Sequence, residues 1–299
     1  MPSARERLAD LLATGPIARA VSQAPLGLLQ RVTRGDGPLE VMAAVEELTD
    51  SGRFVALERA WSDDEDPALV IADYEAVISL LSASGLGSVA EVVVGGGLLA
   101  VPRGAEAFAE LCAQAQDCRV PVLIAPASEV EAEVESALAA VARQRALGRE
   151  VGIVLAAALR RTERDCATVM GRVRLVKGVA GADPGRLGHA IEVDKSFVRC
   201  AKALLARGDA VHPSFATHDG RLIEIVQTLA LRYHRDRLDM EFALYLGRGN
   251  AIQQRLIDAG EQVRVYVPFG PQWLGRLVGG FADQPAVLGA AMRSLVPGA

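Results

Sequence analysis

Short apolar runs alternate with longer amphipathic segments along most of the chain. The segments between the runs are rich in alanine and leucine, and their apolar residues recur with a spacing near 3.6, as in residues 129–145, 196–206 and 221–231. Alternation of this kind predicts parallel strands connected by helices. The predicted strands are residues 54–57, 92–94, 120–124, 152–155, 173–176, 213–216, 238–243 and 263–267. Eight such repeats, about 20 to 40 residues apart, predict a closed α/β barrel of the (β/α)8, or TIM, type.

An open, doubly wound sheet is the alternative arrangement for alternating strands and helices. That fold usually carries a GxGxxG turn after its first strand, and residues 54–61 contain no such sequence. The length of 299 residues also suits one barrel, for which about 250 residues is typical. We therefore expect an N-terminal helical arm, residues 1–37, followed by a single barrel, residues 38–299.

Charge and hydrophobicity narrow the range of partners. The net charge is −5 and no block of lysine or arginine is present, so the basic face that nucleic-acid binding needs is not expected. The longest apolar stretch, residues 92–102, contains three glycines and falls short of the roughly 20 residues that span a bilayer. The N-terminal segment contains Glu6 and Asp10, whereas transit peptides are poor in acidic residues. We expect a cytoplasmic protein without an integral membrane segment.

The four cysteines give no sign of a metal or disulfide framework. Cys112, Cys118, Cys166 and Cys200 form no CxxC motif and no spacing that pairs with histidine. We expect reduced, partly buried thiols and no metal site.

Polar or glycine-rich residues follow five of the predicted strands. The segments are GIVLAAALRRTE (152–163), RVRLVKG (172–178), HPSFATHD (212–219), MEFALYLG (240–247) and RVYVPFG (264–270). The carboxyl ends of parallel barrel strands converge on one mouth, which is where barrel enzymes carry out their chemistry. These segments are therefore the candidate site.

The order and content of these segments resemble the proline dehydrogenase family. The resemblance runs from about residue 41 to residue 295 and is densest after residue 151. Any one segment is a weak signal, whereas the ordered set is specific. The resemblance implies a distorted (β/α)8 barrel that binds FAD and oxidises L-proline. The sequence leaves two electron acceptors open, oxygen and a quinone.

The resemblance also implies a flavin site across the ends of the middle strands. Arg174 matches an arginine that reaches the isoalloxazine near N5, where a fixed cation stabilises the reduced flavin. It could equally pair with a carboxylate such as Glu241, and the two roles are compatible. Lys177 could meet a phosphate or a loop carboxylate. The remaining matched positions approach the cofactor through backbone or polar groups: Val176, Gly178, Val179, Thr217, His218 and Asp219.

Several positions depart from the family pattern. Two arginines that bind the substrate carboxylate become Gly279 and Gly280, and a tyrosine one turn earlier becomes Arg276. Hydrogen bonds to a charged group contribute about 1.5–3 kcal/mol each, so losing both arginines costs roughly 3–6 kcal/mol. The remaining replacements are Gly95 for a lysine, Ala125 for an aspartate, Ala180 for a tyrosine, and Ala156 and Ala243 for two glutamines. We therefore expect negligible oxidation of L-proline.

We expect three large side chains near the mouth. Tyr266 matches a family tyrosine at the substrate site, while Tyr245 and Arg276 are additions. We expect all three to line the substrate pocket, with Tyr266 taking part in catalysis together with Arg174. Core packing is the alternative role for each tyrosine, and an exposed helical position is the alternative for Arg276.

Two functions account for these features. The first is an FAD-dependent oxidoreductase that moves a hydride from a C–N or related nitrogen-bearing bond of a small molecule to flavin N5. Its substrate would be an amine, imino acid or hydrazine-like compound other than proline. The second is an inactive relative that uses the barrel as a binding or scaffolding module, as the lost glutamines, lysine and aspartate suggest. Fold alone does not decide between them.

Overall fold

The computed structural model describes residues 37–61, 65–128, 130–247 and 249–271. Within these ranges eight parallel strands form one closed barrel in chain order, with β1 pairing to both β2 and β8. The strands are β1 (Phe54–Arg59), β2 (Ala90–Gly95), β3 (Val122–Ala125), β4 (Val151–Ala156), β5 (Gly171–Val176), β6 (Val211–Ala216), β7 (Glu241–Tyr245) and β8 (Gln262–Phe269). The predicted (β/α)8 barrel is confirmed. The predicted helical arm lies outside the described residues, apart from its last position, Gly37.

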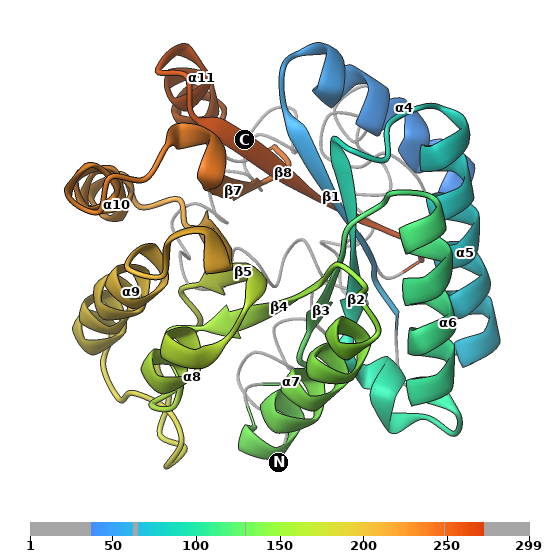
Figure 1. Cartoon of the computed structure of the whole chain (residues 1–299), viewed down its shortest axis with the longest axis horizontal. Helices are drawn as coiled ribbons and strands as arrows, with labels where there is room; N and C mark the ends of the chain where they lie inside the picture. The colour runs from blue at the N-terminus through green and yellow to red at the C-terminus, as the bar shows by residue number, and fades with distance from the viewer. Residues whose placement is uncertain (1–36, 62–64, 129, 248, 272–299) are drawn as a thin grey trace, which may run out of the picture.

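Helices surround the barrel, as Figure 1 shows. Their bounds are α4 (Pro38–Asp50), α5 (Pro67–Ala83), α6 (Gly104–Asp117), α7 (Glu131–Ala146), α8 (Thr162–Thr168), α9 (Ala190–Leu205), α10 (Gly220–Arg232) and α11 (Asn250–Asp258). Short 3-10 turns are η1 (Gly96–Ala100), η2 (Gly208–Ala210) and η3 (Arg237–Asp239). The three helices that apolar spacing predicts correspond to α7, α9 and α10.

Two strands begin later than the pattern predicts, β3 at Val122 rather than residue 120 and β7 at Glu241 rather than residue 238. Leu238 is an apolar residue next to β7, yet it lies in η3 and is 67% exposed. The Asp236 carboxylate accepts a hydrogen bond from the Leu238 amide at 2.8 Å and caps this turn. Local capping therefore delays the strand until Glu241.

The two faces of each strand meet different surroundings. On β1, Val55 and Leu57 are fully buried in the large apolar layer beneath the helices, while Ala56 belongs to a small cluster inside the barrel. Val93 and Leu123 complete that inner cluster. Side chains alternate along a strand, so this assignment fixes which residues point into the barrel on every strand.

The remaining features match the composition. All four cysteines are free thiols, but only Cys118 is half-buried as predicted, because Cys112, Cys166 and Cys200 are fully buried. None of the helices within the described ranges is both long and apolar enough to cross a membrane.

Candidate active site

The carboxyl ends of the strands present mostly small side chains to the mouth of the barrel. By alternation from the inner cluster, the last inward positions are Glu58, Gly95, Ala125, Ala156, Val176, Ala216, Tyr245 and Pro268. Among these eight described positions Glu58 is the one carboxylate. The mouth therefore combines an apolar floor over β3 to β6 with a polar and aromatic side over β7, β8 and β1.

Tyr245, Tyr266 and Glu58 form that polar and aromatic side. The Tyr266 hydroxyl donates a hydrogen bond to Glu58 Oε2 at 2.8 Å, and Glu58 is only 4% exposed. The rings of Tyr245 and Tyr266 meet edge to face with centroids 4.8 Å apart. Both tyrosines are half-buried. The structure thus brings the two predicted tyrosines together at the mouth, while their contact with a substrate stays a prediction.

His218 joins this group from the end of β6. Its ring stacks on Tyr245 with centroids 5.9 Å apart and an interplanar angle of 23°. His218 Nε2 accepts a hydrogen bond from the Tyr245 amide at 3.2 Å, so a neutral imidazole here carries its proton on Nδ1. The imidazole is therefore held in one orientation beside the mouth.

Thr217 and Asp219 form the turn into α10. The Thr217 hydroxyl accepts a hydrogen bond from the Asp219 amide at 3.1 Å. The Asp219 carboxylate accepts one from the Arg221 amide at 2.9 Å and so caps the helix. The amino end of a 13-residue helix thus lies directly beyond β6. A helix amino end favours anions such as phosphate, so this position suits the predicted diphosphate contact.

The segment after β5 runs irregularly over the end of β4. The amides of Ala157 and Ala158 donate to the carbonyls of Val176 and Lys177 at 2.9 and 3.0 Å. Gly178 is half-buried and has φ of +73°, a left-handed conformation that favours glycine. Lys177 Nζ lies 2.6 Å from Asp194 Oδ1, a carboxylate on α9 rather than the predicted loop carboxylate, and its contact with a phosphate stays a prediction.

Arg174 lies inside the barrel, one inward position below Val176. Its guanidinium pairs with Glu91 and lies 3.5 Å from Glu241, while its Nε donates to Ser214 Oγ at 3.3 Å. The residue is 4% exposed. Its partnership with Glu241 confirms the structural role foreseen for it. Contact between Arg174 and a flavin stays a prediction. A flavin at the mouth would have to approach Arg174 from the side of Val176.

Arg264 completes a buried network of four charged residues. Its Nε donates to both oxygens of Glu241, at 2.8 and 2.9 Å, and lies 3.5 Å from Glu91. Burial alone would raise the pKa of Glu241, but the charge and hydrogen bond of Arg264, with the charge of Arg174, lower it below its usual value. The network is close to charge-balanced and fills the barrel beneath the mouth.

Sequence reasoning missed Glu58, Glu91, Arg264 and Trp61. The first three are charged residues at inward positions of otherwise apolar strands. A charged residue at every second position of an apolar strand could have identified them from the sequence. The sequence gives no such signal for Trp61, because this residue lies in the loop after β1. A Cβ added to Gly95 would lie 3.4 Å from Trp61 Nε1, and one added to Gly97 would lie 2.9 Å from its ring. The indole therefore covers the glycines at the end of β2.

Three predicted site residues, Arg276, Gly279 and Gly280, lie outside the described residues. Ala180 is half-buried and packs against Ala158 and Leu187, between β4 and the loop before α9. The backbone carbonyl of Val179 accepts a hydrogen bond from Arg186 at 3.2 Å. The loop after β5 is therefore held in place by the contacts of Val179 and Ala180, and not by residues at the mouth.

The residues at the mouth fit a flavin. Small apolar side chains lie at the ends of β4 to β6, the half-buried Gly178 follows β5, and the amino end of α10 follows β6. Val176, Gly178 and Val179 could contact the ring system, and the Thr217 hydroxyl could donate to the diphosphate side, whereas His218 Nδ1 is buried beside Gly249 and Nε2 accepts from Tyr245. Among the described residues, no cluster of His, Cys, Asp or Glu has the arrangement of a metal site.

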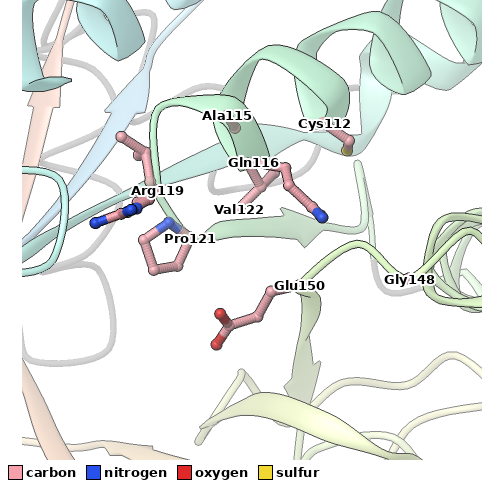
Figure 2. A pocket seen from close by; sticks show the side chains of 9 residues that line it. Cys112, Ala115, Gln116, Arg119, Pro121, Val122, Gly148 and Glu150 are labelled. Carbon is pink, nitrogen blue, oxygen red and sulfur yellow. The ribbon is translucent and has the colours of Figure 1, made fainter.

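A separate cavity of about 420 Å³ lies at the opposite, amino end of the barrel. Figure 2 shows its lining, which comes from the end of α6, the start of β3 and the loop before β4. Gln116, Arg119 and Glu150 are its polar side chains. Residues at this end of a barrel ordinarily serve stability, so the cavity is not the candidate site.

The fold and mouth define a (β/α)8 barrel of the kind that carries a ligand site at its carboxyl end. A family model described as proline dehydrogenase matches residues 188–274. The chain is 28% identical over 149 residues to proline dehydrogenase 2 of Bacillus subtilis, an alignment covering 48% of each chain. It is 28% identical over 153 residues to proline dehydrogenase of Deinococcus radiodurans, covering 50% of this chain and 48% of that one.

Solved structures share the fold. Proline utilization A from Bdellovibrio bacteriovorus, inactivated by N-propargylglycine, matches with a TM-score of 0.78 and 17% identity, covering 99% of this chain and 37% of that one. A Bradyrhizobium japonicum proline utilization A variant matches with a TM-score of 0.69 and 19% identity, covering 90% and 31%. The resemblance to the proline dehydrogenase family is confirmed. The chain spans about half the length of the curated relatives it matches.

Proposed function

We propose that the protein is an FAD-dependent oxidoreductase of the proline dehydrogenase type that acts on a C–N bond. The observation that carries the proposal is the overlap of two independent features. The family model matches residues 188–274, and the same range supplies His218, Tyr245 and Tyr266, which contact one another. A ligand site at the carboxyl end of the strands is where a barrel enzyme would work.

FAD would supply the hydride acceptor for this reaction. The chain would hold it with the backbone of Val176, Gly178 and Val179 and with the amino end of α10 beside Thr217 and His218. Lys177, bound to Asp194, would sit at the edge of this surface. Arg174 would contribute positive potential from below the floor, tempered by its pairing with Glu91 and Glu241. Tyr266 would orient the substrate beside Glu58.

The substrate would be an amine, imino acid or hydrazine-like compound other than proline. The relatives are named proline dehydrogenases, so proline is the first compound to test. Against it stand Gly95 and Ala125 at two strand ends, because neither offers a charged or hydrogen-bonding side chain to an amino acid. A small molecule would be oxidised in the cytoplasm, with oxygen or a quinone taking the electrons from the flavin.

The test is anaerobic mixing of FAD-loaded protein with candidate substrates while flavin absorbance is followed. We expect bleaching by a secondary amine and negligible bleaching by L-proline. Rapid bleaching by millimolar L-proline would overturn the substrate proposal but support the activity. Failure to bind FAD at all would overturn the activity and leave the binding-module alternative.

Arg174→Lys tests the role of the network in the same assay. Lysine keeps the charge opposite Glu91 but loses the planar fork, so we expect slower flavin reduction or weaker FAD binding. Arg199→Lys is the matched control, because Arg199 forms a half-exposed surface pair with Glu163. Unchanged reduction kinetics in Arg174→Lys would remove the residue from the mechanism.

A further inference from the structure

We propose that the cavity at the amino end of the barrel is a second binding site, which takes a small carboxylic acid with an apolar body through the Arg119 guanidinium. The cavity lies at the opposite end of the barrel from the mouth, so this inference goes beyond the proposed function. It concerns binding alone and adds no chemical step.

The cavity has the size and lining of a small-ligand site. Its volume is about 420 Å³, and ligand pockets usually measure roughly 300–1,000 Å³. Its wall is apolar and buried at Cys112, Ala115 and Val122. Its edge is polar and exposed at Gln116 and Arg119 (Figure 2). A ligand with an apolar body and one charged end would match both parts.

Arg119 occupies a backbone position that favours glycine. The amides of Arg119 and Val120 donate to carbonyls of the last turn of α6 at 3.0 and 2.8 Å, and Arg119 has φ of +56°. This helix ending usually has glycine at its left-handed residue, because a side chain there is unfavourable. Four other helices, α4, α5, α7 and α11, end in the same way with glycine at that position: Gly52, Gly85, Gly148 and Gly260. The helix ending therefore does not explain the arginine, whereas a ligand contact would.

The Arg119 guanidinium lies at the edge of the cavity without a protein partner. Among the residues that the structure describes, the side chains of Arg119 and Gln116 form no hydrogen bond or ion pair. A guanidinium binds a carboxylate through two parallel hydrogen bonds, which fix its orientation. Gln116, three residues earlier on α6, can add an amide donor to the same group.

The charges around the cavity favour an anion over a cation. Glu150, the carboxylate of the lining, already pairs with Arg172 at 3.0 Å. Burial raises the pKa of the Cys112 thiol to about 12 and the charge of Arg149 opposes this rise, so a second guanidinium lies close to the wall. Arg149 donates hydrogen bonds to neutral acceptors, which leave its charge uncompensated. An acid would therefore meet a positive potential beside an apolar wall.

The experiment compares three ring compounds of similar size that differ in charge. Benzoate is an anion at neutral pH, benzyl alcohol is neutral and benzylamine is a cation. Binding to the full chain is measured by calorimetry. We expect benzoate to bind with a Kd below about 1 mM and the other two compounds at least about tenfold more weakly. No measurable benzoate binding, or equal binding of the three compounds, would overturn the inference.

Arg119→Gly assigns the binding to the cavity. Glycine suits the left-handed backbone, so this variant should melt at or above the temperature of the unmodified protein while its benzoate affinity falls at least about tenfold. His234→Gly is the matched control, because α10 ends in the same way with His234 at φ of +53°, and His234 does not line the cavity. The control should bind benzoate as tightly as the unmodified protein. Unchanged benzoate affinity in Arg119→Gly would overturn the inference.

Arg119→Lys separates ligand binding from an effect on the helix end. A positive charge near the carboxyl end of a helix is favourable in itself, and lysine keeps it. Lysine lacks the planar fork, so benzoate affinity should still fall about threefold or more. A lysine variant that binds benzoate as tightly as the unmodified protein would contradict the proposed contact.

Discussion

Arg174 on β5 and Glu91 on β2 form an ion pair across the interior of the barrel. The two residues are 83 positions apart in the chain, and both are almost completely buried. Glu241 and Arg264 extend the pair into a network beneath the mouth. The barrel core is therefore partly ionic, and the floor of the candidate site rests on it.

Removing Glu91 should destabilise the protein strongly. Glu91→Ala leaves Arg174 and Arg264 with one fewer buried counter-charge, and breaking a buried pair costs about 3–5 kcal/mol. The free energy of unfolding, measured by urea denaturation, should fall by that amount. Glu106→Ala removes the exposed partner of Arg103 and should change stability by less than about 1 kcal/mol. Equal effects of the two substitutions would contradict the network's role.

Stability should fall as the pH drops below about 6.5, because of His212. Burial, followed by the charge of Arg172, lowers the pKa of His212 below its usual value of 6.5. The unfolded chain therefore binds a proton as the pH falls through about 6.5, while the folded protein does not, so folding becomes less favourable. His212→Gln should flatten this part of the stability curve measured by denaturation at several pH values. If the free energy of unfolding of the variant depended on pH as in the unmodified protein, His212 would not be the cause of this pH dependence.

Gly152 on β4 should not tolerate a side chain. A Cβ at this position would lie 2.5 Å from the backbone carbonyl oxygen of Arg172, which cannot move without disturbing β5. Gly152→Ala should therefore lower the melting temperature, with a cost of about 1–3 kcal/mol from overpacking. Gly185→Ala is the matched control, because a Cβ there meets open space. A Gly152→Ala protein as stable as the control would show that β4 and β5 are not packed this closely.

One thiol should react faster than the others. Cys118 is half-buried, whereas Cys112, Cys166 and Cys200 are buried, and burial raises the pKa of the Cys112 thiol to about 12. Labelling of the native protein with a thiol reagent should show one fast phase that Cys118→Ser removes. A fast phase that survives this substitution would place another cysteine near the surface.

The barrel could be predicted from the sequence because each strand is a short apolar run and each helix has its own spacing. Tyr245, Tyr266 and His218 could be assigned to the mouth because they lie in the carboxyl-terminal part of a strand or just after one, but the sequence did not predict that His218 contacts Tyr245. The partners of Arg174 could not be predicted from the sequence, because the register around a closed barrel decides which inward-facing residues meet across its interior. Trp61 was missed for a similar reason: its direction depends on the bare backbone of Gly95 and Gly97 rather than on any local pattern.

The most direct test of the central claim is the FAD content of the purified full chain. The protein is incubated with excess FAD, freed of unbound cofactor and denatured, and the released flavin is quantified. We predict about one FAD per chain, bound through the ends of β4 to β6. A colourless protein that retains no FAD after this treatment would contradict the account.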